Sequence, residues 1–321
     1  MNSAAASPPS PAPAAGASTI VLAGATGQLG LLIAHHLRRR GAVVRALIRP
    51  AAAASAEAES LRQQGAELIE VDYADAAALA RACRGAGCVV SALSGLREVI
   101  VEAQTQLLEA AVAAGVPRFI PSDFSADFTR LPAGSNRNFD LRREFMRRLD
   151  RAPIQATSVL NGMFMELLKG PAPLLQPGPR LVVHWGDADQ RLDFTTMVDT
   201  AAFAAAAALD PDTPRFLRVA GDVLSIRGLQ AAAEAASGRP YRRLRVGSVG
   251  VLAGLIKVTK TLAPAEDEVF PPWQGMQYLH NMLTGQAKLA EPLDNDRYPE
   301  LHWTTVRELL AEPSPAATRQ E

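Results

Sequence analysis

Three glycines at fixed spacing lie between a short apolar segment and a helical one. The turn is Gly24-Ala25-Thr26-Gly27-Gln28-Leu29-Gly30, directly after Thr19–Ala23. Gly24 permits a tight turn, Gly27 lets a pyrophosphate approach the backbone, and Gly30 allows close helix–strand contact. The N-terminus of the following helix offers unpaired N–H groups and a partial positive charge. This context predicts a dinucleotide-binding site; the alternative is a structural turn beside an empty crevice.

The end of the second apolar segment bears on the choice of cofactor. NAD-specific sites carry Asp or Glu there to hold the ribose 2′-hydroxyl, but this segment ends with Ile48-Arg49-Pro50. A guanidinium can pair with a 2′-phosphate through two hydrogen bonds, whereas a carboxylate would repel it. We therefore predict NADP(H), with Arg49 as its 2′-phosphate ligand. The alternative is that Arg49 is a solvated side chain.

The elements that must position these residues alternate along the first half of the chain. Helix-breaking glycines such as Gly41 and Gly115 follow the helical stretches, where a left-handed cap favours glycine. The alternation predicts an α/β fold with a doubly wound, parallel Rossmann-type sheet. Predicted strands are Thr19–Ala23, Val43–Ile48, Glu67–Val71, Cys88–Ser91, Phe119–Pro121 and Gln155–Leu160, and predicted helices are Gln28–Arg40, Glu57–Gln64, Ala76–Arg84, Glu98–Ala114 and Asn138–Arg151.

After Asn161 the alternation stops. Strands are predicted at Arg180–His184 and Arg191–Phe194, around a Gly186-Asp187 turn, and the remainder from Tyr241 to Leu310 is predicted to be mostly helical. We expect an NADP-binding domain over 19–160 and a smaller, discontinuous mixed α/β substrate lobe over 161–311. Part of the lobe, near 215–219, is expected to return to the main sheet. Residues 1–18 and 312–321 are expected to be flexible tails.

Composition excludes several classes of protein. The 321 residues carry a formal net charge of zero, 48% hydrophobic and 21% charged residues. Neither a basic nucleic-acid-binding face nor a membrane-spanning segment is expected. Cys83 and Cys88 are expected to be reduced packing residues, no histidine has ligand-spaced companions, and no metal site is predicted. Without a recognisable targeting signal, the default expectation is a cytoplasmic protein.

Five segments together resemble the NmrA-like group of atypical short-chain dehydrogenases, which includes isoflavone reductase and phenylcoumaran benzylic ether reductase. The resemblance covers roughly Thr19 to Leu310. The segments are Gly24–Gly30 (GATGQLG), Val90–Gly95 (VSALSG), Ala114–Phe124 (AGVPRFIPSDF), Ala156–Phe164 (ATSVLNGMF) and Asp193–Asp199 (DFTTMVD).

The resemblance implies an NADPH-binding domain beside a smaller substrate lobe. It places Ser91, Leu93 and Ser94 along the adenosine side of the cofactor, and the segment Pro121–Phe124 near the nicotinamide. Both segments follow strands, where open α/β sheets bind ligands. Of the second segment, Ser122 and Phe124 are the predicted cofactor contacts. The alternatives are strand-end capping for the serines and core packing for Phe124.

Hydride transfer also needs a proton donor or a group that stabilises the developing negative charge. Ordinary short-chain dehydrogenases use Tyr-x-x-x-Lys, and none of the four tyrosines here has lysine four positions later. The resemblance implies a lysine early in the helix after Pro121–Phe124. The aligned residue here is Arg142 or, with a shift of one position, Arg143. Arginine is a poor proton shuttle, but it can stabilise an oxyanion or hold a carboxylate of the substrate. The alternative to this catalytic role is that Arg142 is an exposed helix residue.

Weaker candidates lie in the second half of the chain. His184 and Asp187 flank the Gly186 turn and could face a substrate or be structural. The apolar residues Met163, Phe164, Met165 and Leu167 are predicted to line the substrate side, with core packing as the alternative.

Two functions are therefore carried forward. The first is an NADPH-dependent reductase of a small aromatic or apolar organic substrate. The second is a non-catalytic NADP(H)-binding redox sensor of the NmrA type, with a protein partner, favoured by the missing proton-transfer lysine. A sugar-nucleotide epimerase is disfavoured because Tyr-x-x-x-Lys is absent.

Overall fold

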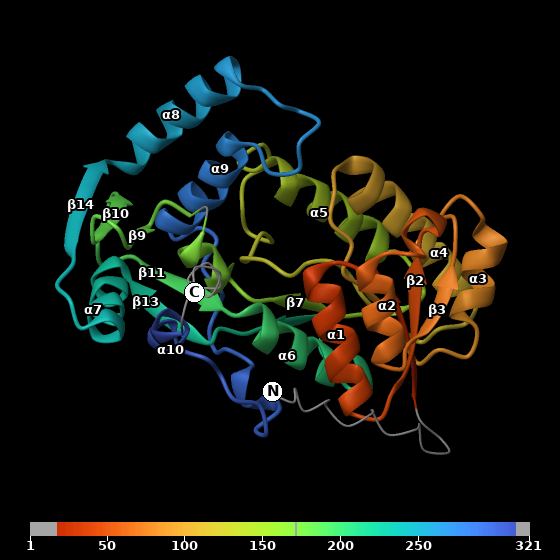
Figure 1. Ribbon diagram of the computed structural model, residues 1–321. Coiled ribbons are helices and arrows are strands. Elements are labelled where there is room, and N and C mark those ends of the chain that lie inside the picture. The colour runs from red at the N-terminus through yellow and green to blue at the C-terminus, as the bar shows by residue number, and fades with distance from the viewer. Residues whose placement is uncertain (1–17, 171, 313–321) are drawn as a thin grey trace.

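A six-stranded parallel sheet organises the first half of the chain in the computed structural model, which describes residues 18–170 and 172–312 (Figure 1). Its strand order is β3-β2-β1-β4-β5-β6, which is the doubly wound order with its switch point between β1 and β4. The strands are β1 (Thr19–Ala23), β2 (Val43–Ile48), β3 (Glu67–Glu70), β4 (Cys88–Ser91), β5 (Arg118–Ile120) and β6 (Gln155–Ala156). The expected tails lie outside the described residues, apart from Ser18 and Glu312.

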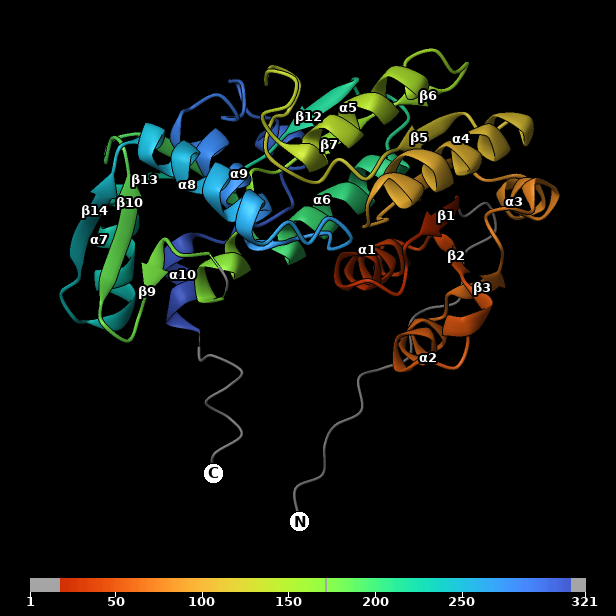
Figure 2. The same cartoon turned by 90° about the horizontal axis from the view of Figure 1, so that it is seen from above.

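Helices cover both faces of this sheet because its strands are apolar on both sides. In β1, Ile20 and Leu22 face one core and Val21 and Ala23 the other, as alternation along a strand requires. Figures 1 and 2 show the two layers on opposite faces. One layer contains α1 (Gln28–Arg39), α2 (Ala56–Gln63) and α6 (Met197–Leu209), and the other α3 (Ala76–Cys83), α4 (Gln104–Ala113) and α5 (Arg137–Leu149).

The second half of the chain forms two small sheets and further helices beside the first half (Figure 2). One sheet has the order β14-β10-β9 and the other β13-β11-β8. Their bounds are β8 (Met163–Phe164), β9 (Leu175–Gln176), β10 (Leu181–Trp185), β11 (Arg191–Thr195), β13 (Asp222–Ser225) and β14 (Arg242–Gly247), with helices α7 (Ile226–Ser237), α8 (Val249–Leu262), α9 (Pro272–Leu283) and α10 (Val306–Ala311). Met165, Phe194, Leu252 and Leu279 belong to the core that these elements share.

One segment of the second half returns to the first. The strand β12 (Phe216–Arg218) pairs in parallel with β7 (Ser158–Leu160), which follows β6 after the single residue Thr157. Pairing therefore continues beyond the edge of the main sheet, at the segment expected near 215–219. The predicted continuous strand Gln155–Leu160 is in fact two short strands, because Ser158 pairs with β12 rather than β5.

Three elements differ in detail from the sequence expectations. The two strands predicted around Gly186-Asp187 are present as β10 and β11, but they lie in different sheets, because β10 pairs with β9 and β14 while β11 pairs with β8 and β13. The expected helix Glu98–Ala114 begins as a π-helical turn, η2 (Glu98–Ala103), before α4. The segment after Tyr241 starts with the strand β14 before becoming helical. In the first and third cases the pairing depends on residues distant in sequence.

Three short 3-10 helices complete the secondary structure of the described residues: η1 (Pro50–Ala52), η3 (Met165–Lys169) and η4 (Asn295–Arg297). Within this part of the chain, none of the helices is both long and apolar enough to cross a membrane.

Candidate functional site

The glycine turn joins β1 to α1 at the carboxyl edge of the sheet. Gly24 has a φ of +72°, and a Cβ there would lie 2.5 Å from the carbonyl oxygen of Ala92, after β4. A Cβ on Gly30 would lie 2.2 Å from the carbonyl oxygen of Gly24. Both positions therefore require glycine for the fold itself, since both contacts are with backbone atoms.

Gly27 differs from its two neighbours. A Cβ at Gly27 would meet only the Gly24 oxygen, at 3.4 Å, which is ordinary contact, and its φ of −75° suits any residue. Gly27 is the N-cap of α1 and is exposed, as is Gln28. The protein alone does not require glycine here, whereas a phosphate lying against the backbone would. This is the arrangement that a dinucleotide turn needs.

Two loops are joined beside this turn. The Ser122 hydroxyl donates a hydrogen bond to the carbonyl of Leu93 at 2.6 Å, and the Ser122 N–H donates to Oε1 of buried Gln104 at 2.9 Å. The loops after β4 and β5 are thus held together at the carboxyl edge of the sheet. Ser122 has a structural role here, and a role in cofactor binding stays a prediction.

The other predicted cofactor residues lie at the carboxyl ends of their strands. Arg49 is exposed just after β2, close enough to Tyr73 to oppose the increase in the Tyr73 pKa that burial causes. Ser91 ends β4 with its Oγ buried and without a hydrogen-bond partner in the described residues, and Ser94 is exposed. Phe124 is only 6% exposed and packs in the core, which agrees with the packing alternative.

Buried amides position the helix that carries the predicted catalytic arginine. Asn136 caps α5, because its Oδ1 accepts the Phe139 N–H at 3.1 Å. The same oxygen accepts a bond from Gln274 on α9 at 2.8 Å, and Nδ2 of Asn136 donates to Asn281 on α9 at 3.3 Å. The rings of Phe139 and Tyr278 meet edge to face at 4.7 Å. The start of α5 is therefore held by a helix from the other half of the molecule.

The two arginines considered for the lysine position have different surroundings. Arg143 donates hydrogen bonds to the carbonyls of Leu131 and Pro132 and to Asp140, so it anchors the loop that precedes α5. Arg142 is half-buried, and its Nε is buried without a hydrogen-bond partner in the described residues. Of the two, Arg142 has the guanidinium with a donor still to be satisfied.

Two groups that sequence reasoning did not select lie near Arg142. Asp123 is fully buried and accepts a 2.6 Å hydrogen bond from Ser158, to which Arg215 donates at 2.7 Å. Burial raises the pKa of Asp123, while Ser158, Arg142 and Arg215 oppose that rise. Its second carboxyl oxygen has no partner in the described residues. Asp123 therefore gives Arg142 a buried carboxyl group as a neighbour.

Tyr278 on α9 is the second such group. Burial raises the pKa of its phenol, and Arg142, Asn138 and Arg137 act in the opposite direction. The phenol is therefore protonated at neutral pH and lies in the field of Arg142. A local motif such as Tyr-x-x-x-Lys does not include this pair, because the two residues are 136 positions apart on different helices.

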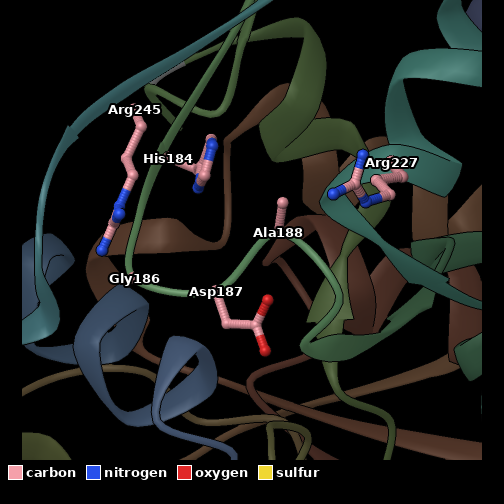
Figure 3. A pocket seen from close by; sticks show the side chains of 6 residues that line it. All are labelled: His184, Gly186, Asp187, Ala188, Arg227 and Arg245. Atoms are coloured by element: carbon pink, nitrogen blue, oxygen red, sulfur yellow. The ribbon is translucent and has the colours of Figure 1, made fainter.

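A separate hollow of about 430 Å³ is lined by His184, Gly186, Asp187, Ala188, Arg227 and Arg245. His184 is 4% exposed, with its Nδ1 unpartnered in the described residues. Burial lowers the pKa of His184, and Arg245 adds to that effect. Figure 3 shows Arg245 and Arg227 on opposite sides of His184, with the Asp187 carboxylate directed away from it. His184 and Asp187, which the sequence analysis placed either facing a substrate or in a structural role, both line this hollow, but their polar groups do not converge.

The apolar residues expected to line the substrate side are only partly available. Met165 is fully buried in the core of the second half, while Met163, Phe164 and Leu167 are half-buried. Cys83 and Cys88 are free and buried. Among the described residues, no group of three or more His, Cys, Asp or Glu side chains could hold a metal ion.

Comparison with known proteins identifies the family of this chain. The model of the NmrA-like family matches residues 16–294, most of the chain. This chain belongs to the NmrA-like family. An isoflavone reductase homolog of Zea mays is 28% identical over 310 residues, covering 91% of this chain and 97% of its own. A bifunctional pinoresinol-lariciresinol reductase of Linum album is 27% identical, with coverage of 94% and 95%.

The fold of the NmrA-like chain also matches solved structures. AtPrR2, solved with NADP⁺ and (+)-pinoresinol, superposes with a TM-score of 0.75 at 24% sequence identity, covering 92% of this chain and 98% of AtPrR2. The match therefore extends over both halves of the molecule. It shows that the sheet and the elements beside it are arranged as in a Rossmann-type fold.

Proposed function

We propose that this NmrA-like protein is an NADPH-dependent reductase of a small aromatic or apolar organic molecule. The observation that carries the proposal is the glycine turn at the switch point of the sheet. Of its three glycines, Gly27 is the one at which the packing of the protein itself leaves room for a side chain. Its relatives in Zea mays and Linum album are named as a reductase homolog and a reductase, and AtPrR2 was solved with NADP⁺ and (+)-pinoresinol.

The residues at the carboxyl edge fit a dinucleotide phosphate. The α1 N-terminus and the backbone around Gly27 would hold the pyrophosphate, and Arg49 would pair with the 2′-phosphate. Thr26, Gln28 and Leu29 complete the turn, and Ser91, Leu93 and Ser94 would line the adenosine side. Bound NADPH supplies a hydride equivalent.

Arg142 is proposed to act on the substrate side of this reaction. Hydride addition to carbon moves an electron pair onto the neighbouring atom of the acceptor, which becomes negatively charged and must then gain a proton. A guanidinium with an unsatisfied donor can stabilise that charge, although it is a poor proton donor itself. The buried phenol of Tyr278 stays protonated beside it, and solvent is the alternative proton source.

The proposal is tested by rapid mixing of the enzyme and NADPH with a panel of aromatic enones, quinones and benzylic ethers, following absorbance at 340 nm. We expect oxidation with at least one class. Arg142→Ala should lower kcat by about 10²- to 10³-fold, as loss of one charge-stabilising donor does, without changing the Kd for NADPH. Arg147→Ala, an exposed arginine on the same helix, is the matched control and should leave both values unchanged.

The sensor hypothesis predicts a different result. Tight NADPH binding with no oxidation across the panel, together with partner affinity or conformation that differs between NADPH and NADP⁺, would replace the reductase proposal. The observation that favours the sensor is the arginine at the position of the family lysine.

A further inference from the structure

The helix α8 exposes a continuous apolar stripe. Val251 is 54% exposed, Leu255 42%, Val258 54% and Leu262 80%. Their spacings of four, three and four residues place all four on one side of the helix, as in the seam of a coiled coil. Leu252, next to Val251 but turned toward the rest of the protein, is fully buried in the core. Figures 1 and 2 show α8 on the outside of the second half, far from the six-stranded sheet.

The residues beside this stripe carry no charge. Gly254 and Thr261 lie along one flank by helical periodicity, and Thr259 lies along the other. Lys257 and Lys260 lie farther round the helix, and the Lys260 ammonium lies over the Trp273 ring at 5.0 Å. A second helix could therefore approach the stripe without bringing like charges together.

The two ends of α8 have opposite charge. Before the helix, the exposed strand β14 contains Arg242, Arg243 and Arg245. After the helix, Glu266, Asp267 and Glu268 are exposed in succession. The carbonyls of Glu266 and Glu268 accept hydrogen bonds from Arg137, which holds the acidic segment near the start of α5 and leaves its carboxylates exposed.

We propose that this surface, defined by the α8 stripe and its two charged ends, binds a second copy of this chain. The two α8 helices lie antiparallel about a twofold axis. Each apolar stripe then covers the other, and the basic end of each chain faces the acidic end of its partner. The twofold axis produces this favourable charge contact twice, once at each end of the interface. A parallel arrangement would instead bring like charges together at both ends. An anionic membrane would attract the basic end but repel the acidic one.

The size of the surface sets the expected strength of the dimer. A helix of 14 residues is about 21 Å long at 1.5 Å per residue. A standard interface covers about 800 Å² per partner, which is more than the α8 stripe alone provides. Leu244 and Val246 on β14, which are 44% and 42% exposed, extend the apolar surface beside the helix. We therefore expect a dimer with a micromolar Kd that weakens as salt screens its end charges.

The test is sedimentation-velocity analysis of the full chain over a range of concentrations up to about 100 µM, which is above the micromolar Kd expected for the dimer. Wild type should shift from monomer to dimer. The double variant Leu255→Asp with Val258→Asp should remain monomeric, with its NADPH affinity and thermal stability unchanged because both sites are exposed. Val198→Asp, at a 48% exposed position on α6, is the matched control and should dimerise normally.

Charge reversal tests the antiparallel arrangement. Changing Glu266, Asp267 and Glu268 to arginine should weaken the dimer, and changing Arg242, Arg243 and Arg245 to glutamate in the same chain should restore it. A wild type that stays monomeric throughout, a seam variant that still dimerises, or a monomer that binds phosphatidylglycerol vesicles through α8 would each overturn the proposal. These readouts are independent of turnover, so failure of the reductase assay would not affect them.

Discussion

A methyl group added at Gly27 should separate cofactor binding from folding. The Cβ added by Gly27→Ala would meet only the Gly24 carbonyl oxygen, at 3.4 Å, and the backbone at Gly27 already has an ordinary φ of −75°. Alanine loses some N-cap preference relative to glycine but restricts the unfolded chain, and each effect is about 0.5–1 kcal/mol. The free energy of unfolding should therefore change little.

The same methyl group should hinder a bound dinucleotide. If the pyrophosphate lies against the Gly27 backbone, the added carbon overpacks that contact, which costs about 1–3 kcal/mol. That cost corresponds to an increase of about 5- to 160-fold in the Kd for NADPH. The effect should be similar for NADPH and NADH, because the pyrophosphate is common to both.

The assay combines thermal unfolding with fluorescence titration of NADPH. Gly30→Ala is the contrasting variant: its Cβ would lie 2.2 Å from a backbone oxygen, so it should lower the unfolding temperature as well as the affinity. The reasoning is refuted if Gly27→Ala binds NADPH as tightly as wild type. It is equally refuted if Gly27→Ala loses stability as Gly30→Ala does, since the turn would then be required for folding alone.

Three further predictions concern individual side chains. Arg49→Asp should weaken NADPH much more than NADH in the same titration, and an unchanged preference would remove Arg49 from the cofactor site. Burial, together with His35 and nearby arginines, lowers the pKa of His36 from 6.5 to about 4. The unfolded chain then binds a proton more readily, so the free energy of unfolding should fall as the pH drops from about 6.5 to about 4. In His36→Gln this part of the pH dependence should disappear, as urea unfolding at each pH would show. Burial raises the pKa of Cys83 to about 11 and of Cys88 to about 12, so native protein should not react with a thiol reagent at pH 7, while unfolded protein should react at two sites.

Local patterns in the sequence determined the first half of the fold. The strand β1, the glycine turn and α1 follow one another within 21 residues, and their apolar periodicity and glycine spacing come from neighbouring positions alone. Parallel strands joined by helices have few available topologies, so the position of Arg49 and Ser91 at the carboxyl edge followed from the order of elements. The structure agrees at these points because the constraints are short-range.

Long-range packing decided the rest. Sequence alignment left Arg142 and Arg143 open, and only the loop at Leu131–Pro132 shows that Arg143 is engaged elsewhere. The neighbourhood of Arg142 depends on Tyr278, which α9 brings to α5 through buried amides. The strands β10 and β11 are nearly adjacent in sequence yet pair in different sheets. Periodicity indicates that α8 has apolar residues, but only the tertiary structure shows which side is covered, because burial depends on the neighbours that other parts of the chain supply.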